Sequence, residues 1–194
     1  RLAGEKIASV RPGVDVEITR EPIGVVGIIT PWNFPSGMLT RKAAAALAAG
    51  CTVVAHPSAE TPFSALALAE LGERAGMPAG VFNVITGIAP TIVEPWTKDP
   101  RVRALSFTGS TEIGRLLYRQ SADTVKRLVL ELGGHAPVIV FKDADLDHAV
   151  QETMKAKFAT SGQDCLGANR IYVEREIYDA FCERFTKAAK ALTV

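Results

Sequence analysis

The fold is decided by the stretch GVVGIITPWNFPSGMLTRKAAAALAAGCTVVAH, residues 24–56. It contains a β-branched run at 25–30, an alanine-rich amphipathic segment at 38–50 and a second β-branched run at 51–56. Strands buried in a parallel sheet are short apolar runs, and helices cross over between them. The stretch therefore predicts a strand, a helix and a second strand that lies parallel to the first.

The same alternation continues along the chain, so we expect an α/β fold with a doubly wound parallel sheet. Thr61 with Pro62 should cap a helix at 63–76, whereas Pro90 and Pro95 allow at most a short or broken helix. The other expected strands are 81–86, 103–109, 127–132, 137–141 and 170–174, and the other expected helices are 111–121, 145–162 and 175–192.

The alternation starts afresh at Gly133, which divides the chain into parts. Residues 21–134 are expected to form one α/β unit, and 135–194 the beginning of another. Residues 1–20 carry the alternating segment VDVEITR, which is either a strand at an interface between subunits or a lone edge strand. The first residue is not Met and the last helical pattern has no cap, so we expect a longer polypeptide.

The composition is that of a globular protein, because 47% of the 194 residues are hydrophobic and 22% are charged. The net charge is only +1 and the charges are scattered, so neither nucleic acid nor an acidic membrane surface is an expected partner. The apolar run 43–55 is too short to cross a bilayer. Three cysteines are too few for a disulfide framework or a close-spaced zinc site, and they fit a reducing, cytoplasmic compartment.

Cys165 lies in the loop SGQDCLGANR, residues 161–170, between an expected helix and an expected strand. A nucleophilic thiol needs exposure and either a nearby base or a lowered pKa, and a turn offers the exposure. The alternative is an inert loop cysteine. Cys182 falls on the apolar face of a helix and Cys51 begins a buried strand, so neither is a candidate nucleophile.

Glu131 is the candidate general base, because it ends the apolar strand RLVLEL at the carboxyl edge of the expected sheet. Parallel sheets present their functional residues at that edge, and a partly buried carboxylate there suits proton abstraction. The alternative is an ordinary glutamate that faces solvent. The three histidines, His56, His135 and His148, are poorly placed for this role.

Two turns carry further candidates. In FTGSTEIG a strand runs into Gly109, and Ser110 opens a helix whose first N–H groups could bind a pyrophosphate or could simply be capped by that serine. In PWNFP two prolines hold a rigid turn around Asn33. Its amide could donate to a developing oxyanion or could only satisfy the turn.

Four motifs, ITPWNFP, FTGSTEIG, LELGG and GQDC, stand in the order and approximate spacing of the aldehyde dehydrogenase superfamily. The chain is identified as a partial member, with less than half the length of a family protein. Flanking segments such as AGMPAGVFNVITG and ANRIYV are similar to the succinate-semialdehyde dehydrogenase branch. The resemblance implies that 21–134 is an NAD(P)-binding, Rossmann-like domain and that 135–194 begins the catalytic domain.

The resemblance implies oxidation of an aldehyde, a semialdehyde such as succinate semialdehyde, to a carboxylic acid. Cys165 would attack the aldehyde, and its N–H with the Asn33 side chain would bind the oxyanion. Glu131 would activate the hydrolytic water, Lys42 would support proton transfer, and hydride would pass to NAD or NADP. The residues implied to contact that cofactor are Ile29, Thr30, Pro31, Trp32, His56, Ser58, Ala59, Gly109, Ser110, Leu132 and Gly133.

Two positions depart from the family pattern at the adenosine ribose. His56 replaces the lysine of relatives, and Ala59 replaces the glutamate of NAD-preferring relatives. Without a carboxylate to repel a 2′-phosphate, we expect NADP to be accepted and the cofactor affinity to be reduced. Residues 90–95 replace the family's glycine-rich segment, so the helix on the adenine side is expected to be altered.

Further departures concern the substrate. Arg41 matches one arginine that the succinate-semialdehyde branch uses on the substrate carboxylate, but Ala159 stands in place of the second. A less polar aldehyde, or a semialdehyde of another length, is therefore a rival substrate. Gly167 replaces the regulatory second thiol of the branch, which predicts no redox switch at that point.

Two other functions stay open at the level of the sequence. One is a cofactor-independent thiol esterase or acyl transferase, and the other is a catalytically inactive family fragment. The resemblance also implies a homo-oligomer, either a dimer or a tetramer, whose small-molecule partner is the aldehyde.

Overall fold

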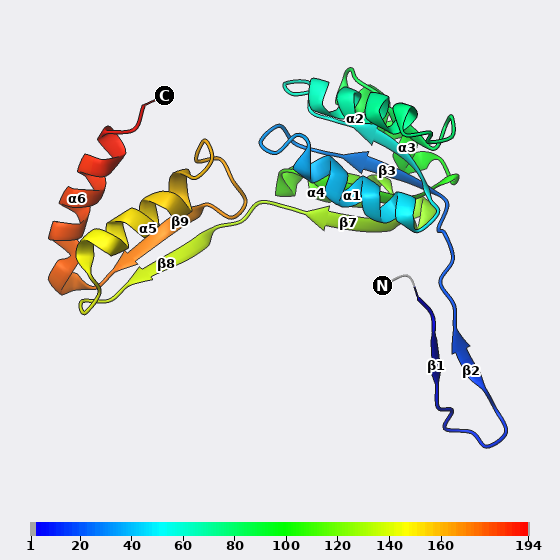
Figure 1. Ribbon diagram of the computed structural model, residues 1–194, viewed down its shortest axis with the longest axis horizontal. Coiled ribbons are helices and arrows are strands. Elements are labelled where there is room, and N and C mark those ends of the chain that lie inside the picture. Colours follow the sequence, from blue (N-terminus) through cyan, green and yellow to red (C-terminus); the bar gives the residue numbers. More distant parts are fainter. Residues whose placement is uncertain (1–2, 194) are drawn as a thin grey trace. The chain divides into compact units, whose positions relative to one another are not determined.

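The computed structural model describes residues 3–193. The chain divides into two compact units, Arg1–Glu131 and Leu132–Val194. The second unit thus begins at Leu132, three residues before the expected start at 135. Figure 1 labels the helices and strands of both units.

A five-stranded parallel sheet forms the middle of the first unit (Figure 1). Its spatial order is β5, β4, β3, β6, β7, so the chain starts at the centre, builds one half and returns to build the other. The reversal between β3 and β6 is a topological switch point, and the expected doubly wound α/β fold is confirmed. The strands are β3 Val25–Ile29, β4 Thr52–His56, β5 Phe82–Val84, β6 Val102–Thr108 and β7 Arg127–Glu131.

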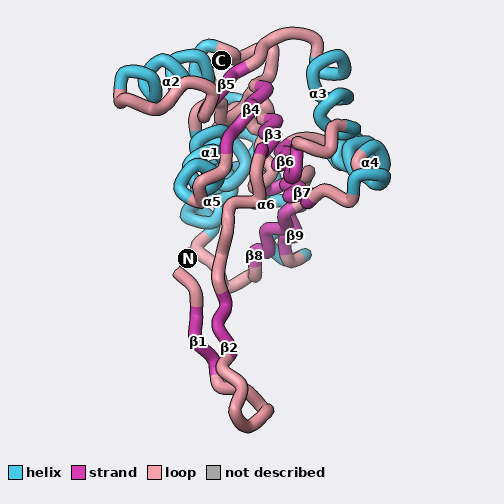
Figure 2. The backbone as a smooth tube through the Cα atoms, turned by 90° about the vertical axis from the view of Figure 1, so that its right-hand side faces the viewer, coloured by secondary structure: helices cyan, strands magenta, loops and turns pink. Residues whose placement is uncertain are grey.

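Helices cover both faces of this sheet. Figure 2 shows α1 and α2 on one side of the strands and α3 and α4 on the other. Successive strand residues point to opposite faces, so Val26 and Ile28 pack under α1 while Gly27 faces α3. A Cβ at Gly27 would lie 3.1 Å from Cε3 of Trp96, so glycine lets α3 approach closely. The helices are α1 Gly37–Ala48, α2 Phe63–Arg74, α3 Ala89–Lys98, α4 Thr111–Gln120 and the 3-10 helix η1 Ala122–Thr124.

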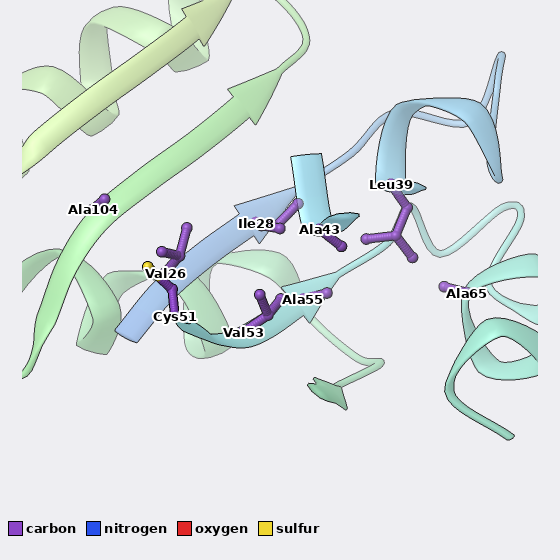
Figure 3. Close-up of a cluster of buried hydrophobic side chains, with 9 residues drawn as sticks. All are labelled: Val26, Ile28, Leu39, Ala43, Cys51, Val53, Ala55, Ala65 and Ala104. Carbon is purple, nitrogen blue, oxygen red and sulfur yellow. The ribbon is translucent and has the colours of Figure 1, made fainter. Parts of the chain in front are cut away.

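Small and β-branched side chains make the core between α1, α2 and the sheet, as Figure 3 shows. Ile28 and Ala65 are completely buried, and Leu39, Val53 and Ala55 are each 1% exposed. The small alanine side chains let the helix backbones lie close to the β-branched strand residues, so the core is packed without large voids. The alanine-rich segment of the opening stretch therefore becomes α1 because the sheet buries its apolar face.

Two helix starts in the first unit depend on proline. The expected cap by Thr61 is wrong: its Oγ1 donates to the Trp32 carbonyl at 3.5 Å, and α2 has Pro62 as N-cap with no side-chain cap bond. The hydroxyl instead joins the start of α2 to the loop after β3. α3 is the short helix expected from its two prolines, because Pro90 lies in the first turn and Pro95 removes a single hydrogen bond.

Lys126 joins the turn after α3 to the start of β7. Its Nζ donates to three backbone carbonyls, those of Trp96 at 2.8 Å, Asp99 at 3.0 Å and Val102 at 2.9 Å. Burial lowers the pKa of Lys126, and the charge of Asp99 partly opposes that shift. The preceding Val125 has a left-handed backbone with φ of 48°, which marks a tight reversal at this point.

The first unit also contains an antiparallel pair of short strands, β1 Glu5–Ile7 and β2 Val16–Ile18. The expected strand in the segment VDVEITR is confirmed by β2. Ile7 and Ile18 are 46% and 39% exposed, so the apolar side chains of this pair are left largely open by the described residues.

The second unit consists of two parallel strands, β8 and β9, with α5 as the crossover between them. α5 ends at Phe158, before the expected end at 162, and Gly162 turns the chain with a φ of 76°. Across residues 3–193, no helix is long and apolar enough to cross a membrane. The elements are β8 Ala136–Val140, α5 Leu146–Phe158, β9 Ala168–Val173, the 3-10 helix η2 Arg175–Ile177 and α6 Tyr178–Lys190.

The core of the second unit lies on one face of its sheet. Val140, Val150 and Phe181 are buried there, between the strands and the helices α5 and α6. On the opposite face, Ile139 is 62% and Tyr172 is 53% exposed. This sheet is therefore covered by described residues on one face only.

Candidate active site

Polar side chains form a row at the carboxyl edge of the five-stranded sheet. β6 and β7 pair Thr108 with Glu131, and Thr30 follows β3 at the same level, so the three side chains share a face. Thr30 and Thr108 are 4% and 6% exposed. Their hydroxyls and Glu131 Oε2 have no hydrogen-bond partner among the described residues. Since buried polar atoms are normally bonded, this row can form hydrogen bonds with a ligand.

Lys42 reaches the same face from α1. Its Nζ donates to Ser106 Oγ at 3.2 Å, and Ser106 lies two residues before Thr108 on β6. Burial lowers the pKa of Lys42, the charge of Glu131 partly opposes that shift, and Arg41 adds to it. A lysine with a lowered pKa exchanges its proton more readily near neutral pH, as general acid–base chemistry requires.

Asn33 lies in the loop that leaves β3 at the switch point. Residues 31–35 are all half-buried. The loop is bonded on both sides of Asn33, because the Trp32 carbonyl accepts from Thr61 and the Phe34 carbonyl accepts from Met38 N at 2.9 Å. Hydrogen bonds therefore hold the backbone on both sides of Asn33, as expected from the two prolines. Binding of an oxyanion by the Asn33 amide stays a prediction.

His56 ends β4 and is 4% exposed. Its Nδ1 lies 2.9 Å from the Ile85 carbonyl oxygen, which only accepts, so Nδ1 carries the proton and a neutral ring keeps Nε2 as an acceptor. Ser58 is half-buried, with its Oγ accepting from Glu60 N at 3.3 Å, and Ala59 is exposed. The ring can accept a hydrogen bond from a hydroxyl, but its reach is shorter than that of a lysine.

Ser110 caps α4, because its Oγ accepts from Ile113 N at 3.3 Å. Gly109 N donates to the Glu131 carbonyl at 3.1 Å, which fixes the turn that connects β6 to the helix. The N-cap interpretation of FTGSTEIG is confirmed. The positive end of the helix dipole also suits an anion at this position, so phosphate binding stays a prediction.

Cys165 is half-buried in a β-turn of the second unit. Gly167 N donates to the Asp164 carbonyl at 3.1 Å, and Leu166 N donates to Asp164 Oδ1 at 2.9 Å. Asp164 thus closes the turn twice, once with its backbone and once with its carboxylate. Thr160 Oγ1 donates to the other carboxylate oxygen at 3.5 Å, which ties the turn to the end of α5.

The loop around Cys165 is also fixed from outside. Lys157 Nζ donates to the Gly162 carbonyl at 3.1 Å and to Asn169 Oδ1 at 2.6 Å, which joins the two ends of the loop. A Cβ at Gly134 would overlap the carbonyl oxygen of Cys165. The second glycine of LELGG is therefore required so that the chain can pass close to the turn.

The other candidate residues lie at less constrained positions. Arg41 is exposed on α1, and Ala159 is the exposed C-cap residue of α5. Gly167 is buried at the end of the turn. Leu132 and Gly133 are the first residues of the second unit. Leu132 is half-buried, and Gly133 is exposed.

The sequence analysis assigns no role to Ser106, which bonds Lys42 in the first unit, or to Asp164, which precedes Cys165 in the second unit. Ser106 and Thr108 alternate within an otherwise apolar strand, which is the signal that places two polar side chains on one face. Asp164 and Gly167 have the spacing of a turn that begins with Asp and ends with Gly. Both patterns are common in proteins, so they indicate a functional site only when a catalytic candidate is known to lie beside them.

The aldehyde dehydrogenase family model matches residues 1–194, and the chain belongs to this family. The resemblance seen in the four motifs is confirmed. The fold agrees as well: the solved structure of succinate-semialdehyde dehydrogenase from Burkholderia pseudomallei is 50% identical, with a TM-score of 0.95 over 100% of this chain and 40% of that one.

Two curated relatives cover the whole chain. The non-phosphorylating aspartate-semialdehyde dehydrogenase of Halomonas elongata is 57% identical, and the NADP(+) succinate-semialdehyde dehydrogenase GabD of Escherichia coli is 54% identical. The chain covers 39% of the first relative and 40% of the second, so it spans about two fifths of their length.

Proposed function

We propose that the polypeptide containing this chain oxidises an aldehyde to a carboxylic acid with NAD or NADP, and that the substrate is a semialdehyde such as succinate semialdehyde. Family membership supports the reaction, and the two semialdehyde dehydrogenases described above support the substrate class. The observation in this chain that carries the proposal is the row of Thr30, Thr108 and Glu131, with Lys42 beside it.

In the proposed reaction, the Cys165 thiolate attacks the aldehyde carbon and forms a thiohemiacetal. The Cys165 N–H and the Asn33 amide hold the oxyanion. A nicotinamide held by the residues at the switch point would supply the hydride acceptor, and loss of hydride would convert the thiohemiacetal on Cys165 into a thioester. Glu131 then removes a proton from the attacking water, and Lys42 passes that proton toward solvent. Hydrolysis releases the carboxylic acid and regenerates the thiol.

The residues at the switch point fit a dinucleotide. Ligands of open α/β sheets bind where the strand order reverses, here between the loop after β3 and the turn after β6. The N-terminus of α4 at Gly109 and Ser110 suits a pyrophosphate, and the unbonded Thr30 and Thr108 hydroxyls suit a carboxamide. Further contacts are proposed for Ile29, Pro31, Trp32, Ser58, Leu132 and Gly133.

NADP is the cofactor we expect to be accepted. Ala59 presents no carboxylate to a 2′-phosphate, and His56 offers an acceptor nitrogen where relatives have a lysine. Replacing His56 with Lys should tighten cofactor binding, as measured by quenching of tryptophan fluorescence. Ala67→Lys, at an exposed position of α2, is a control for added charge. A dissociation constant that His56→Lys leaves unchanged would contradict the ribose contact.

The activity is tested with a panel of aldehydes and either NAD+ or NADP+, followed through the absorbance of reduced nicotinamide. Cys165→Ala should abolish turnover, whereas Cys182→Ala should retain it. Glu131→Gln should slow hydrolysis, so that the acyl group accumulates on Cys165 and is detected by mass spectrometry. Full turnover by Cys165→Ala would refute the proposed nucleophile.

The same assay separates the two alternatives. Hydrolysis of an ester without nicotinamide, and with no aldehyde oxidation, would indicate a thiol esterase or acyl transferase. No turnover with any pair of substrate and cofactor would indicate an inactive family fragment.

Arg41 is the proposed contact for a substrate carboxylate. Arg41→Met should raise KM for succinate semialdehyde and leave KM for an uncharged aldehyde of similar length unchanged. Ala159 provides no second guanidinium, so a semialdehyde of another length is the rival substrate. Equal effects of Arg41→Met on both aldehydes would argue against the contact.

A homo-oligomer, dimer or tetramer, is the proposed assembly, with the β1–β2 pair as part of its interface. The exposed Ile7 and Ile18 support an interface there. Ile18→Lys should lower the mass measured by analytical ultracentrifugation, and Val129→Lys is the matched control on another exposed strand. An unchanged mass for Ile18→Lys would exclude this pair from the interface.

A further inference from the structure

Asp164 is the residue immediately before the proposed nucleophile, and none of the proposed roles uses it. Its carboxylate folds over the Cys165 peptide, because Oδ1 accepts from Leu166 N at 2.9 Å while the backbone carbonyl accepts from Gly167 N at 3.1 Å. The negative charge is therefore held within one residue of Cys165 by the geometry of the turn. It cannot swing away without losing its hydrogen bonds from Leu166 N and Thr160 Oγ1.

The bonds of this carboxylate leave its charge in place. Its partners are the Leu166 N–H and the Thr160 hydroxyl, which are both neutral. No salt bridge joins Asp164 to a cation in residues 3–193. Lys157, in the last turn of α5, is bonded to the Gly162 carbonyl and Asn169 Oδ1 instead. Since Asp164 is half-buried, water screens its charge only in part.

We infer that Asp164 is a specificity-determining residue, which disfavours electrophiles that carry negative charge close to the carbon attacked by Cys165. The inference rests on the proposed function, in which Cys165 is the nucleophile. The inference narrows the proposed class of substrates. The Asp164 carboxylate repels an aldehyde that carries its own carboxylate directly on the aldehyde carbon. A semialdehyde with two or more methylene groups between its aldehyde and its carboxylate is repelled less, because the repulsion falls with distance.

Two alkylating reagents test the charge effect without cofactor or turnover. Iodoacetamide is neutral, and iodoacetate carries a carboxylate on the reacting carbon. With either reagent the thiolate sulfur forms a bond to that carbon, and iodide leaves with the electron pair of the broken C–I bond. The same thiolate attacks both reagents, so the thiolate fraction cancels in the ratio of the two rates. The intrinsic difference between the reagents is the same in every variant, so the change of the ratio between variants reports the repulsion by Asp164.

The experiment measures the ratio at Cys165 by peptide mass spectrometry, with Cys182 in the same chain as an internal reference. Asp164→Asn keeps the side-chain oxygen that closes the turn and removes the charge. It should lower the iodoacetamide-to-iodoacetate ratio at Cys165 by roughly threefold to tenfold and leave the ratio at Cys182 unchanged. Asp143→Asn, an exposed acidic position in the same unit, should leave both ratios unchanged.

A second measurement needs no substitution. Raising the concentration of sodium chloride to about 1 M screens the charge and should lower the ratio at Cys165 of the unaltered chain more than the ratio at Cys182. This measurement decides the matter if circular dichroism shows that Asp164→Asn does not fold. A ratio that neither change alters would overturn the role of Asp164. Retained turnover in Cys165→Ala would instead overturn the proposed function, whatever the alkylation ratio.

Discussion

The strands β3 and β8, the first strands of the two parallel sheets, are buried to different extents. In the first unit, β3 has a strand on each side and helices on both faces, and Ile28 is completely buried. In the second unit, the described residues give β8 one neighbouring strand and helices on one face, and Ile139 is 62% exposed. Both strands are similar apolar runs in the sequence. Two strands of similar composition are thus buried to different extents, because neighbouring strands and helices cover β3 more fully than β8.

The largest expected effect comes from breaking the core of the first unit. Leu105 is completely buried in β6, next to Gly27. Leu105→Ala should lower the free energy of unfolding by about 2–5 kcal/mol, because it leaves a cavity that the neighbours cannot fill. Urea unfolding followed by tryptophan fluorescence reports this unit, since Trp32 and Trp96 both lie in it.

The matched control for that change is Val129→Ala on β7, where the side chain is 61% exposed. It should change the free energy of unfolding by about 0.5 kcal/mol or less. Similar losses for the two variants would contradict the assignment of β6 to a closed core.

The next effect concerns the turn that Lys126 holds. Lys126→Met removes a charged donor from three carbonyls and should lower the free energy of unfolding by about 2–3 kcal/mol. Lys98→Met is the control, because Lys98 forms an exposed ion pair with Glu94 four residues away. That loss should stay within about 0.5 kcal/mol, and equal losses would show that the three carbonyls contribute little.

A smaller effect is expected in the second unit. Gly134→Ala places a methyl group against the Cys165 carbonyl, which should lower the free energy of opening of β8 and β9 by about 1–3 kcal/mol. Amide hydrogen exchange measures that opening strand by strand. Gly37→Ala is the control, since its added Cβ would meet only Phe34 Cβ, at 4.0 Å. Unchanged exchange in Gly134→Ala would mean that the turn moves aside freely.

The smallest effect tests surface charge at the turn of the first unit. Hydrogen bonds from Arg101 lower the pKa of Asp99 from 3.8 to about 2. Since the folded pKa lies below the unfolded one, the stabilisation is present above about pH 4 and is lost as the pH falls toward 2. A carboxylate titration by NMR should give this midpoint, and Arg101→Ala should return it toward 3.8. A midpoint near 3.8 in the unaltered chain would contradict the pairing.

Much of the first unit could be predicted from the sequence, because Gly or Pro bounds each β-branched run and a helical pattern separates one run from the next. The same reasoning placed Glu131 at the carboxyl edge, since the apolar strand stops there before two glycines. The partners of Thr61 and Lys126 could not be predicted, because their bonds reach carbonyls 24 to 30 positions away in the sequence. Such contacts depend on how the elements pack.

The three carbonyl oxygens around Lys126 Nζ are the kind of ligands that a small hard cation takes up from solution. Here the cation is covalently tethered to the chain. A chelator cannot extract it, dilution cannot empty the place it fills, and no other ion has to be supplied for the turn to form. The turn that leads into the central sheet is thereby independent of the metal content of its surroundings.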